Sequence, residues 1–288
     1  MKTALLQLTS SDDPKENLGI VRKMMQQAAD QGAGFVLTPE VTNCVSSSRD
    51  QQRAVLAMQE DDATLAGLRD EAARLGLWLL IGSLALKTSD ADGRFANRSF
   101  LVAPDGEIQA WYDKIHMFDV QVSEAETYKE SAGFRPGERA VLADAGFARI
   151  GLTVCYDIRF PHLHRTLAQA GAQILTVPAA FSPVTGAAHW EPLLRARAIE
   201  TGCYVLAPAQ TGLHPSSTGG TRRTYGHRGG TRRTYGHSMV ISPWGDVMAD
   251  AGTSPGITFV DLDMDAVAQA RARVPALTHD RKFTAPDV

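Results

Sequence analysis

Cysteine is scarce in this sequence, and its placement excludes several classes of protein. The 288 residues include three cysteines, Cys44, Cys155 and Cys203, and no pair of them has C-x-x-C spacing. An odd and sparse set is not a disulfide framework, which favours a reducing compartment, and we expect a cytoplasmic protein. A structural zinc site usually takes its thiolates in closely spaced pairs, so we expect no metal.

Long hydrophobic runs and an excess of one charge are missing as well. The longest apolar stretch, 77–86, is interrupted by Gly82 and Ser83 and is too short to cross a bilayer. Residues 1–8 contain one cation and a very short apolar run, unlike a signal peptide. The formal net charge of −3 gives no general attraction to nucleic acid or to a membrane surface. We therefore expect a small-molecule partner, with no nucleic acid and no membrane.

The composition that remains is that of an ordinary globular enzyme. Hydrophobic residues make up 44% and charged residues 21% of the chain, which is enough for a large core. No linker-like boundary interrupts the middle of the sequence. We predict one domain over residues 1–272, followed by a polar C-terminal tail over 273–288.

Hydrophobic periodicity predicts strands and helices that alternate in two similar halves. Strands are predicted over 3–8, 35–37, 77–86, 97–103, 107–113, 139–143, 147–154, 173–177, 204–207, 238–242, 246–249 and 257–261, and helices over 14–31, 62–75, 161–170, 187–201 and 264–272. The stretch 115–137 is predicted to be rich in loops. In the long helix, Leu193, Leu194, Ala198 and Ile199 are expected to face inward. The alternation indicates an α/β fold with helices on the outer faces of the sheets.

A tandem duplication lies in the second half of the chain. Residues 219–228 read GGTRRTYGHR and residues 229–238 read GGTRRTYGHS, identical at nine of ten positions. The period is too short and too isolated for a solenoid. Only the second copy runs directly into the strand-like 239–241. We therefore predict that the second copy occupies the position that this segment would have without the duplication, and that the first copy is an exposed loop insertion. The negative net charge and the absence of a nucleic-acid motif argue against binding of nucleic acid by the duplicated arginines.

Three ionisable residues, Glu40, Lys114 and Cys155, each follow an apolar strand. Strand ends are where open α/β folds place their sites. A carboxylate, an ammonium and a thiol can supply a base, a cation for a developing oxyanion and a nucleophile. Because Cys155 precedes a predicted helix, the helix N-terminus and nearby cations are expected to lower its thiol pKa. Each residue also has an ordinary interpretation, as a surface cap, a solvated strand end or a buried core residue.

Longer motifs surround these three residues. They are LTPE at 37–40, YDKIH at 112–116, CYDIRFP at 155–161, AGAQILTVPAAF at 170–181, TGAAHWEPLLRARAIETGCYV at 185–205 and YGHSMVISPWG at 235–245. In this order they resemble the nitrilase, or carbon–nitrogen hydrolase, superfamily over nearly the whole chain. The resemblance implies a four-layer αββα sandwich, a catalytic triad of Glu40, Lys114 and Cys155, no metal or organic cofactor, and a homodimer or homotetramer.

The resemblance also implies a mechanism. Glu40 takes the thiol proton, Cys155 attacks the carbonyl carbon, and Lys114 together with the backbone N–H of Tyr156 stabilises the oxyanion. A thioester forms and is then hydrolysed by water that Glu40 activates. Glu130 matches a second family glutamate that would orient Lys114 and keep it charged. The alternative for Glu130 is a solvated loop glutamate.

Substrate contacts are implied in the same way. Arg159 matches an arginine that related amidases use to bind a substrate carboxylate, a task suited to its planar fork. The alternative is a structural ion pair with Asp157 or Glu200. Phe181 and Thr185 are expected to wall the substrate pocket, although Phe181 fits a core position nearly as well.

Within the family, the run from Cys155 to Tyr204 and the later Arg-Arg-Thr-Tyr-Gly-His-Ser-Met resemble amidases that act on deaminated glutathione. The resemblance implies a thiol amidase that cleaves the C–N bond of a small carboxylate-bearing amide and releases ammonia. Three other reactions stay open: hydrolysis of α-ketoglutaramate by an ω-amidase, hydrolysis of an N-carbamoyl amino acid, and hydrolysis of a nitrile. A non-catalytic binding protein is disfavoured, because it would have no reason to retain all three triad residues.

Overall fold

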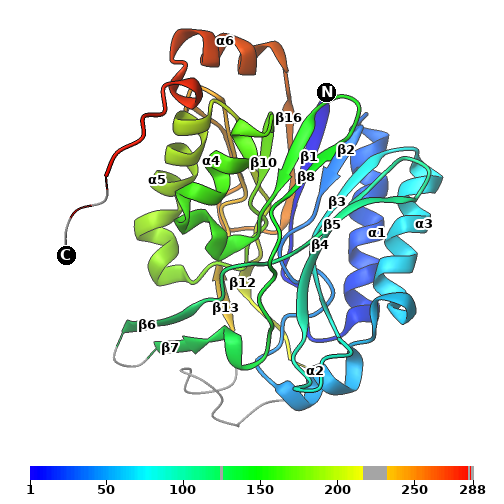
Figure 1. Cartoon of the computed structure of the whole chain (residues 1–288). Helices are drawn as coiled ribbons and strands as arrows, with labels where there is room; N and C mark the ends of the chain where they lie inside the picture. The colour runs from blue at the N-terminus through cyan, green and yellow to red at the C-terminus, as the bar shows by residue number, and fades with distance from the viewer. Residues whose placement is uncertain (124–125, 217–231, 285, 287–288) are drawn as a thin grey trace.

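Two six-stranded sheets pack face to face between two layers of helices (Figure 1). This is the arrangement in a computed structural model, which describes residues 1–123, 126–216, 232–284 and 286. The predicted αββα sandwich is therefore confirmed. Helices α1 and α3 lie on one side of the stacked sheets and helices α4 and α5 on the other.

The first sheet has the strand order β16-β1-β2-β3-β4-β5. Its strands are β1 (Lys2–Gln7), β2 (Phe35–Leu37), β3 (Trp78–Leu86), β4 (Ala96–Val102), β5 (Ile108–Asp113) and β16 (Gly256–Asp261). Strands β1, β2 and β3 are parallel, and the other three pair antiparallel with their neighbours. Helices α1 (Pro14–Asp30) and α3 (Ala63–Leu75) cover its outer face. Asp13 caps α1 by accepting from the N–H groups of its first turn, and Pro14 then fits the first helical position.

The second sheet has the strand order β15-β14-β11-β10-β9-β8. Its strands are β8 (Val141–Asp144), β9 (Arg149–Leu152), β10 (Ile174–Thr176), β11 (Tyr204–Ala207), β14 (Met239–Ile241) and β15 (Val247–Asp250). The central strands β9, β10 and β11 are parallel. Helices α4 (Pro161–Gln169) and α5 (Pro183–Thr201) cover this sheet, and α6 (Asp265–Arg273) and a 3-10 turn, η4 (Ala276–Thr278), follow β16.

Alternation along the strands divides the apolar residues between two cores. In β1, Leu5 packs between the sheets together with Leu37 and Leu80. Ala4 and Leu6 point to the opposite face and pack against α1 and α3. Successive side chains of a strand point to opposite faces, so strands buried on both sides read as continuous apolar runs. This is why the short central strands were predictable.

Smaller elements gather at one end of the sandwich, the lower end in Figure 1. They are α2 (Arg49–Val55), the 3-10 turns η1 (Gln59–Asp61), η2 (Glu130–Ala132) and η3 (Cys155–Arg159), and two strand pairs, β6 (Asp119–Ser123) with β7 (Glu126–Lys129) and β12 (Thr211–Leu213) with β13 (Arg233–Tyr235). The prediction of loops over 115–137 was wrong, since β6 and β7 lie there. Neither β7 nor α2 carries a long apolar pattern, so local sequence gave little signal for them.

The long helix α5 differs from its prediction in two ways. It begins at Pro183, not at 187, because Ser182 and Pro183 start it. The expectation that Ile199 faces inward was wrong, since its exposed fraction is 57%, while Leu194 and Ala198 are fully buried. Leu194 and Ala198 are four residues apart and share one helix face, whereas Ile199 lies about 100° further round the helix. Its side chain instead packs against the turn at Gly245.

The second copy of the duplication continues into the sheet. Its described residues, 232–238, pass through β13 and lead directly into β14, where Met239 and Val240 are buried. The first copy, 219–228, lies outside the described residues. Its assignment as a loop insertion, and the boundary of the domain at 272, therefore stay predictions.

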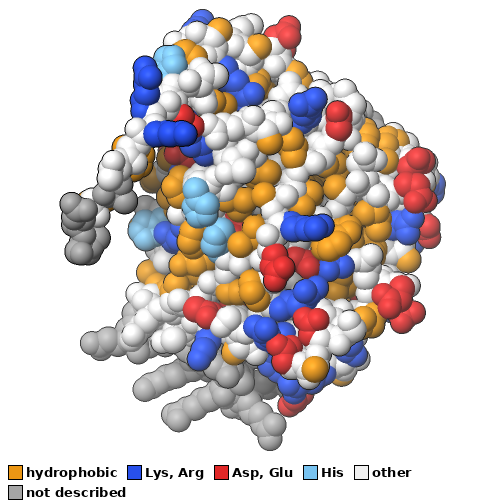
Figure 2. Space-filling model, in the orientation of Figure 1, with side chains coloured by type: hydrophobic (Ala, Val, Ile, Leu, Met, Phe, Trp, Pro, Cys, Tyr) orange, Lys and Arg blue, Asp and Glu red, His pale blue; other side chains and the backbone are white. Residues whose placement is uncertain are grey.

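Charges of both signs are mixed on the surface. On the face drawn in Figure 2, Lys and Arg side chains lie next to Asp and Glu side chains. This distribution agrees with the small net charge of −3. Among the residues that the structure describes, no helix combines the length and the hydrophobicity needed to cross a bilayer.

The contact of Gly82 with the loop before Glu40 gives a testable prediction. A Cβ atom at Gly82 would lie 2.0 Å from the Thr38 carbonyl oxygen and 2.6 Å from Cβ of Pro178. We expect Gly82→Ala to cost about 1–3 kcal/mol of unfolding free energy, because backbone on one side and a proline on the other cannot both move away. Thermal unfolding measures the effect.

The matched control is Gly19→Ala on α1, where an added Cβ has no neighbouring heavy atom within 4 Å. That change should stabilise the helix by up to about 1 kcal/mol. A Gly82→Ala protein as stable as the wild type would show that the loop before Glu40 is not held by this contact.

Candidate active site

A cavity opens at the end of the sandwich where several strand ends meet. Glu40 follows β2, Lys114 follows β5, Cys155 follows β9 and Ala180 follows β10, and all four line it. Further lining comes from α2, from β7 and from the residue before β13. The strand ends predicted from sequence to carry chemistry are therefore brought together.

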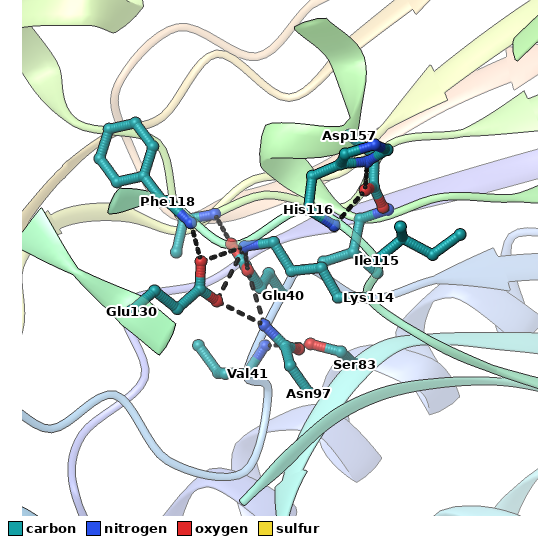
Figure 3. Close-up of polar contacts among 12 residues, drawn as sticks. Glu40, Val41, Ser83, Asn97, Lys114, Ile115, His116, Phe118, Glu130 and Asp157 are labelled. Carbon is teal, nitrogen blue, oxygen red and sulfur yellow. Dashed lines mark hydrogen bonds and ion pairs between the residues drawn. The ribbon is translucent and has the colours of Figure 1, made fainter. Parts of the chain in front are cut away.

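Lys114 lies at the centre of a buried ionic cluster, with only 2% of its surface exposed. Its Nζ donates to Glu40 Oε1 at 2.9 Å and to both carboxylate oxygens of Glu130 at 2.9 Å (Figure 3). Asn97 Nδ2 also donates to Glu40 Oε1 at 2.9 Å. The second oxygen of Glu130 accepts from the N–H of Phe118 at 2.7 Å. One ammonium thus bridges two carboxylates that come from distant parts of the chain.

Glu40 is held on both of its oxygens. While Oε1 faces Lys114, Oε2 accepts from the N–H of Ala180 at 2.8 Å. The next residue, Val41, has a left-handed φ of +48°, and its N–H donates to the Ser83 hydroxyl at 2.8 Å. A β-branched residue in that region is strained, so the surrounding contacts must fix this turn. Glu40 therefore has little freedom to move away from Cys155.

Cys155 begins the 3-10 turn η3 and has an unusual backbone. Its φ is +51°, and its N–H donates to the Pro178 carbonyl at 2.9 Å. A non-glycine residue in this conformation costs about 1–3 kcal/mol, and such strain concentrates at functional sites. Tyr156 is the second residue of the turn, where an N–H group has no acceptor within the helix. That N–H is the type of donor that an oxyanion requires.

Asp157 holds the turn that carries the cysteine. Its Oδ2 accepts from the Val154 N–H and from the Tyr112 hydroxyl, both at 2.8 Å. Its Oδ1 accepts from the backbone N–H of His116 at 3.0 Å and lies 2.7 Å from its ring Nδ1. The His116 ring stacks on Phe160 with 3.5 Å between ring centroids. Asp157 is fully buried and acts on the position of its neighbour Cys155 through these bonds.

The ionic cluster is charged at neutral pH. Burial raises the pKa of Glu40, but the charge and hydrogen bond of Lys114 outweigh burial and hold that pKa below its ordinary 4.5. Burial lowers the pKa of Lys114, but Glu130 and then Glu40 raise it well above 10.5. Glu40 is therefore a carboxylate and Lys114 an ammonium in the resting site.

The thiol of Cys155 behaves differently from the expectation drawn from its position before a helix. Burial, followed by the Glu40 carboxylate, raises its pKa well above 9.0, and the opposing effect of Lys114 is smaller. The expected lowering of this pKa was wrong, because burial disfavours the thiolate and the largest charge effect on the thiol comes from the Glu40 anion. The resting site holds a neutral thiol beside a carboxylate base, and the nucleophile must be deprotonated during the reaction.

Three of the four predicted substrate-binding residues line the cavity: Tyr156, Phe181 and Thr185. Phe181 also packs against Trp190 with 4.8 Å between ring centroids, so it belongs to both the core and the wall. The Thr185 hydroxyl is buried and has no hydrogen-bond partner within the described part of the chain. A polar group of this kind is a candidate to meet a substrate atom.

Arg159 lies at the edge of the cavity. Its guanidinium carbon is 5.8 Å from the centre of the Tyr156 ring and 5.6 Å from that of Phe181. It also contacts Nδ1 of His189 at 3.2 Å. Neither alternative ion pair forms between described residues, since Asp157 pairs with His116, and Glu200 pairs with Arg197. The binding of a substrate carboxylate by Arg159 stays a prediction.

Sequence reasoning missed three contributors to the site: Asn97, the Ala180 N–H and Arg232. A polar residue at the start of the apolar strand β4 was a signal for Asn97. Arg232 is in the second copy of the duplication, which attracted attention for its repetition and not for its chemistry. Among the described residues, no group of His, Cys, Asp and Glu is arranged to hold a metal.

Known proteins share this fold and sequence. A sequence model of the carbon-nitrogen hydrolase family matches residues 2–272. A deaminated glutathione amidase from Synechocystis is 38% identical over 278 residues, covering 96% of each chain. The crystal structure of Nit3 from Saccharomyces cerevisiae, a member of branch 10 of the nitrilase superfamily, has a TM-score of 0.81 and 28% identity, covering 98% of this chain and 97% of that one.

A third relative bears on the chemistry of the cysteine. It is a glutamate-to-glutamine variant of the amidase from Nesterenkonia sp. AN1, which shows the result of Michael addition of acrylamide at the active-site cysteine. It has a TM-score of 0.73 and 29% identity, covering 96% of this chain and 98% of that chain. From the family match and the near full-length identity, this chain belongs to the carbon–nitrogen hydrolase family and is a hydrolase of carbon–nitrogen bonds other than peptide bonds.

Proposed function

We propose that this protein is a thiol amidase that hydrolyses a carboxylate-bearing amide of the deaminated glutathione type. The observation that carries the proposal is the neutral Cys155 thiol beside the buried Glu40 carboxylate, with Lys114 fixed between Glu40 and Glu130. The name and coverage of the Synechocystis relative support the choice of substrate class. Localisation in the cytoplasm and assembly into a homodimer or homotetramer are part of the same proposal.

In the acylation half of the reaction, Glu40 accepts the proton of the Cys155 thiol as sulfur attacks the amide carbonyl carbon. The oxyanion that develops is stabilised by Lys114 Nζ and by the N–H of Tyr156. Glu40 then donates its proton to the amide nitrogen, and the C–N bond breaks to leave a thioester. Preorganised donors of this kind contribute ~100–1000-fold each to the rate.

In the deacylation half, Glu40 removes a proton from water as the water oxygen attacks the thioester carbonyl. The same donors stabilise the second oxyanion. Collapse of this intermediate expels the Cys155 thiolate, which takes back the proton from Glu40 and leaves a carboxylic acid as product. One carboxylate therefore serves four proton transfers, and its two fixed oxygens suit that task.

The leaving group follows from the nature of the amide. A primary amide such as α-ketoglutaramate releases ammonia, which is the product expected from sequence. The side-chain amide nitrogen of glutathione belongs to a cysteinylglycine unit, so its deaminated form releases that dipeptide instead. The proposed steps are the same for both, because Glu40 protonates the departing nitrogen in either case.

The first prediction for this mechanism concerns Glu40→Gln. We expect kcat to fall about 100- to 10,000-fold, since the carboxylate base beside the thiol is lost. Cys155 should still react covalently with acrylamide, as the active-site cysteine did in the Nesterenkonia variant. Ammonia or amine release measures turnover, and mass spectrometry measures the adduct.

The matched control for that variant is Glu71→Gln, which neutralises another buried carboxylate that pairs with Arg22 and Arg74 on the outer helices. It should change stability and leave turnover intact, while Cys155→Ala should abolish both turnover and adduct. Near-normal turnover of Glu40→Gln would assign the base to another residue.

A second prediction concerns pH. Glu130 is the largest charge that raises the pKa of Lys114, so Glu130→Gln should lower that pKa. Because activity requires Lys114 as a cation, activity of the variant should be lost at a lower pH on the alkaline side than in the wild type. The pH profile of kcat/KM, with a parallel melting curve at each pH, checks this. An alkaline limb at the same pH in both proteins would contradict the role of Glu130.

A further inference from the structure

We propose that Arg232 binds an anionic group on the leaving-amine half of the substrate, so that the enzyme selects amides of acidic amines over primary amides. This inference rests on the proposed amidase function and names the substrate class more closely. Arg232 belongs to the duplicated segment, and the catalytic steps proposed above give it no role.

The charges of the cavity favour an anionic substrate. Both lining carboxylates, Glu40 and Glu130, are bound by Lys114. The other charged residues that line the described cavity are all cations, namely Arg49, Lys129 and Arg232. A substrate with one negative charge on its acyl half would pair with one of these cations, and a second anionic group could pair with another.

Arg232 is anchored beside the catalytic base. Its carbonyl accepts from the N–H of His214 at 2.9 Å, which fixes its backbone to the residue that follows β12. Its guanidinium donates to the Ala180 carbonyl at 3.4 Å, and the N–H of the same Ala180 binds Glu40 at 2.8 Å. The side chain is half-buried, and it forms no ion pair with a carboxylate of the described residues. A guanidinium has five N–H donors, so several are available to a ligand.

The position of Glu40 indicates which half of the substrate meets Arg232. Glu40 gives its proton to the departing nitrogen, so that nitrogen must come within hydrogen-bond distance of the carboxylate. Groups attached to the nitrogen must then continue past Glu40 and the peptide of Ala180, where the Arg232 guanidinium lies. Burial raises the pKa of Glu40 and Lys114 lowers it, and the positive charge of Arg232 is close enough to add a smaller lowering effect.

Arg159 lies at the edge of the cavity on a different segment, beside Tyr156, whose N–H faces the acyl carbonyl in the proposed mechanism. Each arginine therefore binds a different half of the substrate: Arg159 binds the acyl half and Arg232 binds the leaving half. Deaminated glutathione carries a carboxylate on each half. α-Ketoglutaramate carries one on its acyl half alone, since ammonia leaves.

Three substrates with one common acyl group test this division. They are the primary amide, the amide of cysteinylglycine, and the same dipeptide amide with its C-terminal carboxylate converted to a carboxamide. All three form the same thioester, so deacylation is identical and kcat/KM reports acylation. Arg232→Met should lower the ratio of kcat/KM for the acidic dipeptide amide to that for its carboxamide about 10- to 100-fold, as expected for a lost charge-assisted hydrogen bond.

The neighbouring Arg233 provides the matched control, because it is exposed on β13 and does not line the cavity. Arg233→Met should keep the wild-type ratio. Arg232→Lys should recover part of it, because a point charge replaces the planar fork. Arg159→Met should lower kcat/KM for all three substrates by a similar factor, since they share the acyl half.

A uniform loss over the three substrates in Arg232→Met would overturn the proposal and make Arg232 a positioning residue for Glu40. An unchanged ratio would overturn it as well. Failure of the amidase function itself would look different, because the wild-type enzyme would then hydrolyse none of the three substrates.

Discussion

The bridge of Lys114 between the buried carboxylate of Glu40 and the partly buried carboxylate of Glu130 is the interaction on which the rest of this structure depends. Each of its three charges would be costly to bury alone, and each is stabilised only while the other two are in place. Glu40 comes from the end of β2, Lys114 from the end of β5, and Glu130 from the turn after the β6–β7 hairpin. The pairing therefore requires that the first sheet, the hairpin and the second sheet's Ala180 N–H meet at one end of the sandwich.

The part of the site that local sequence predicts is the part that lies at strand ends. Glu40, Lys114 and Cys155 each follow an apolar run, and the ends of such strands meet in the structure. Glu130 follows a polar hairpin that has no long apolar pattern, so its position came from family resemblance alone. The same difference separates the correctly predicted central strands from the missed α2 and β6–β7 elements.

Properties that depend on burial could not be predicted from the amino-acid sequence. The thiol pKa of Cys155 was expected to fall, and it rises because burial disfavours the thiolate and because the anionic Glu40 acts on it more strongly than Lys114 does. Ile199 fits an apolar helical pattern but lies outside the face shared by Leu194 and Ala198. Arg232 is separated from Glu40 by 192 positions along the sequence numbering, and only the tertiary fold brings its charge to the base.

A neutral thiol beside a fixed carboxylate is well suited to a buried site. When the proton passes from Cys155 to Glu40, the total charge of the cluster does not change, and negative charge moves from one neighbour of Lys114 to another. A preorganised site therefore avoids the cost of creating a new buried charge. As Glu40 becomes neutral, the Lys114 donor that bound it becomes available to the oxyanion, while Glu130 continues to hold the ammonium in place. The second glutamate is thus what allows one lysine to serve first the base and then the transition state.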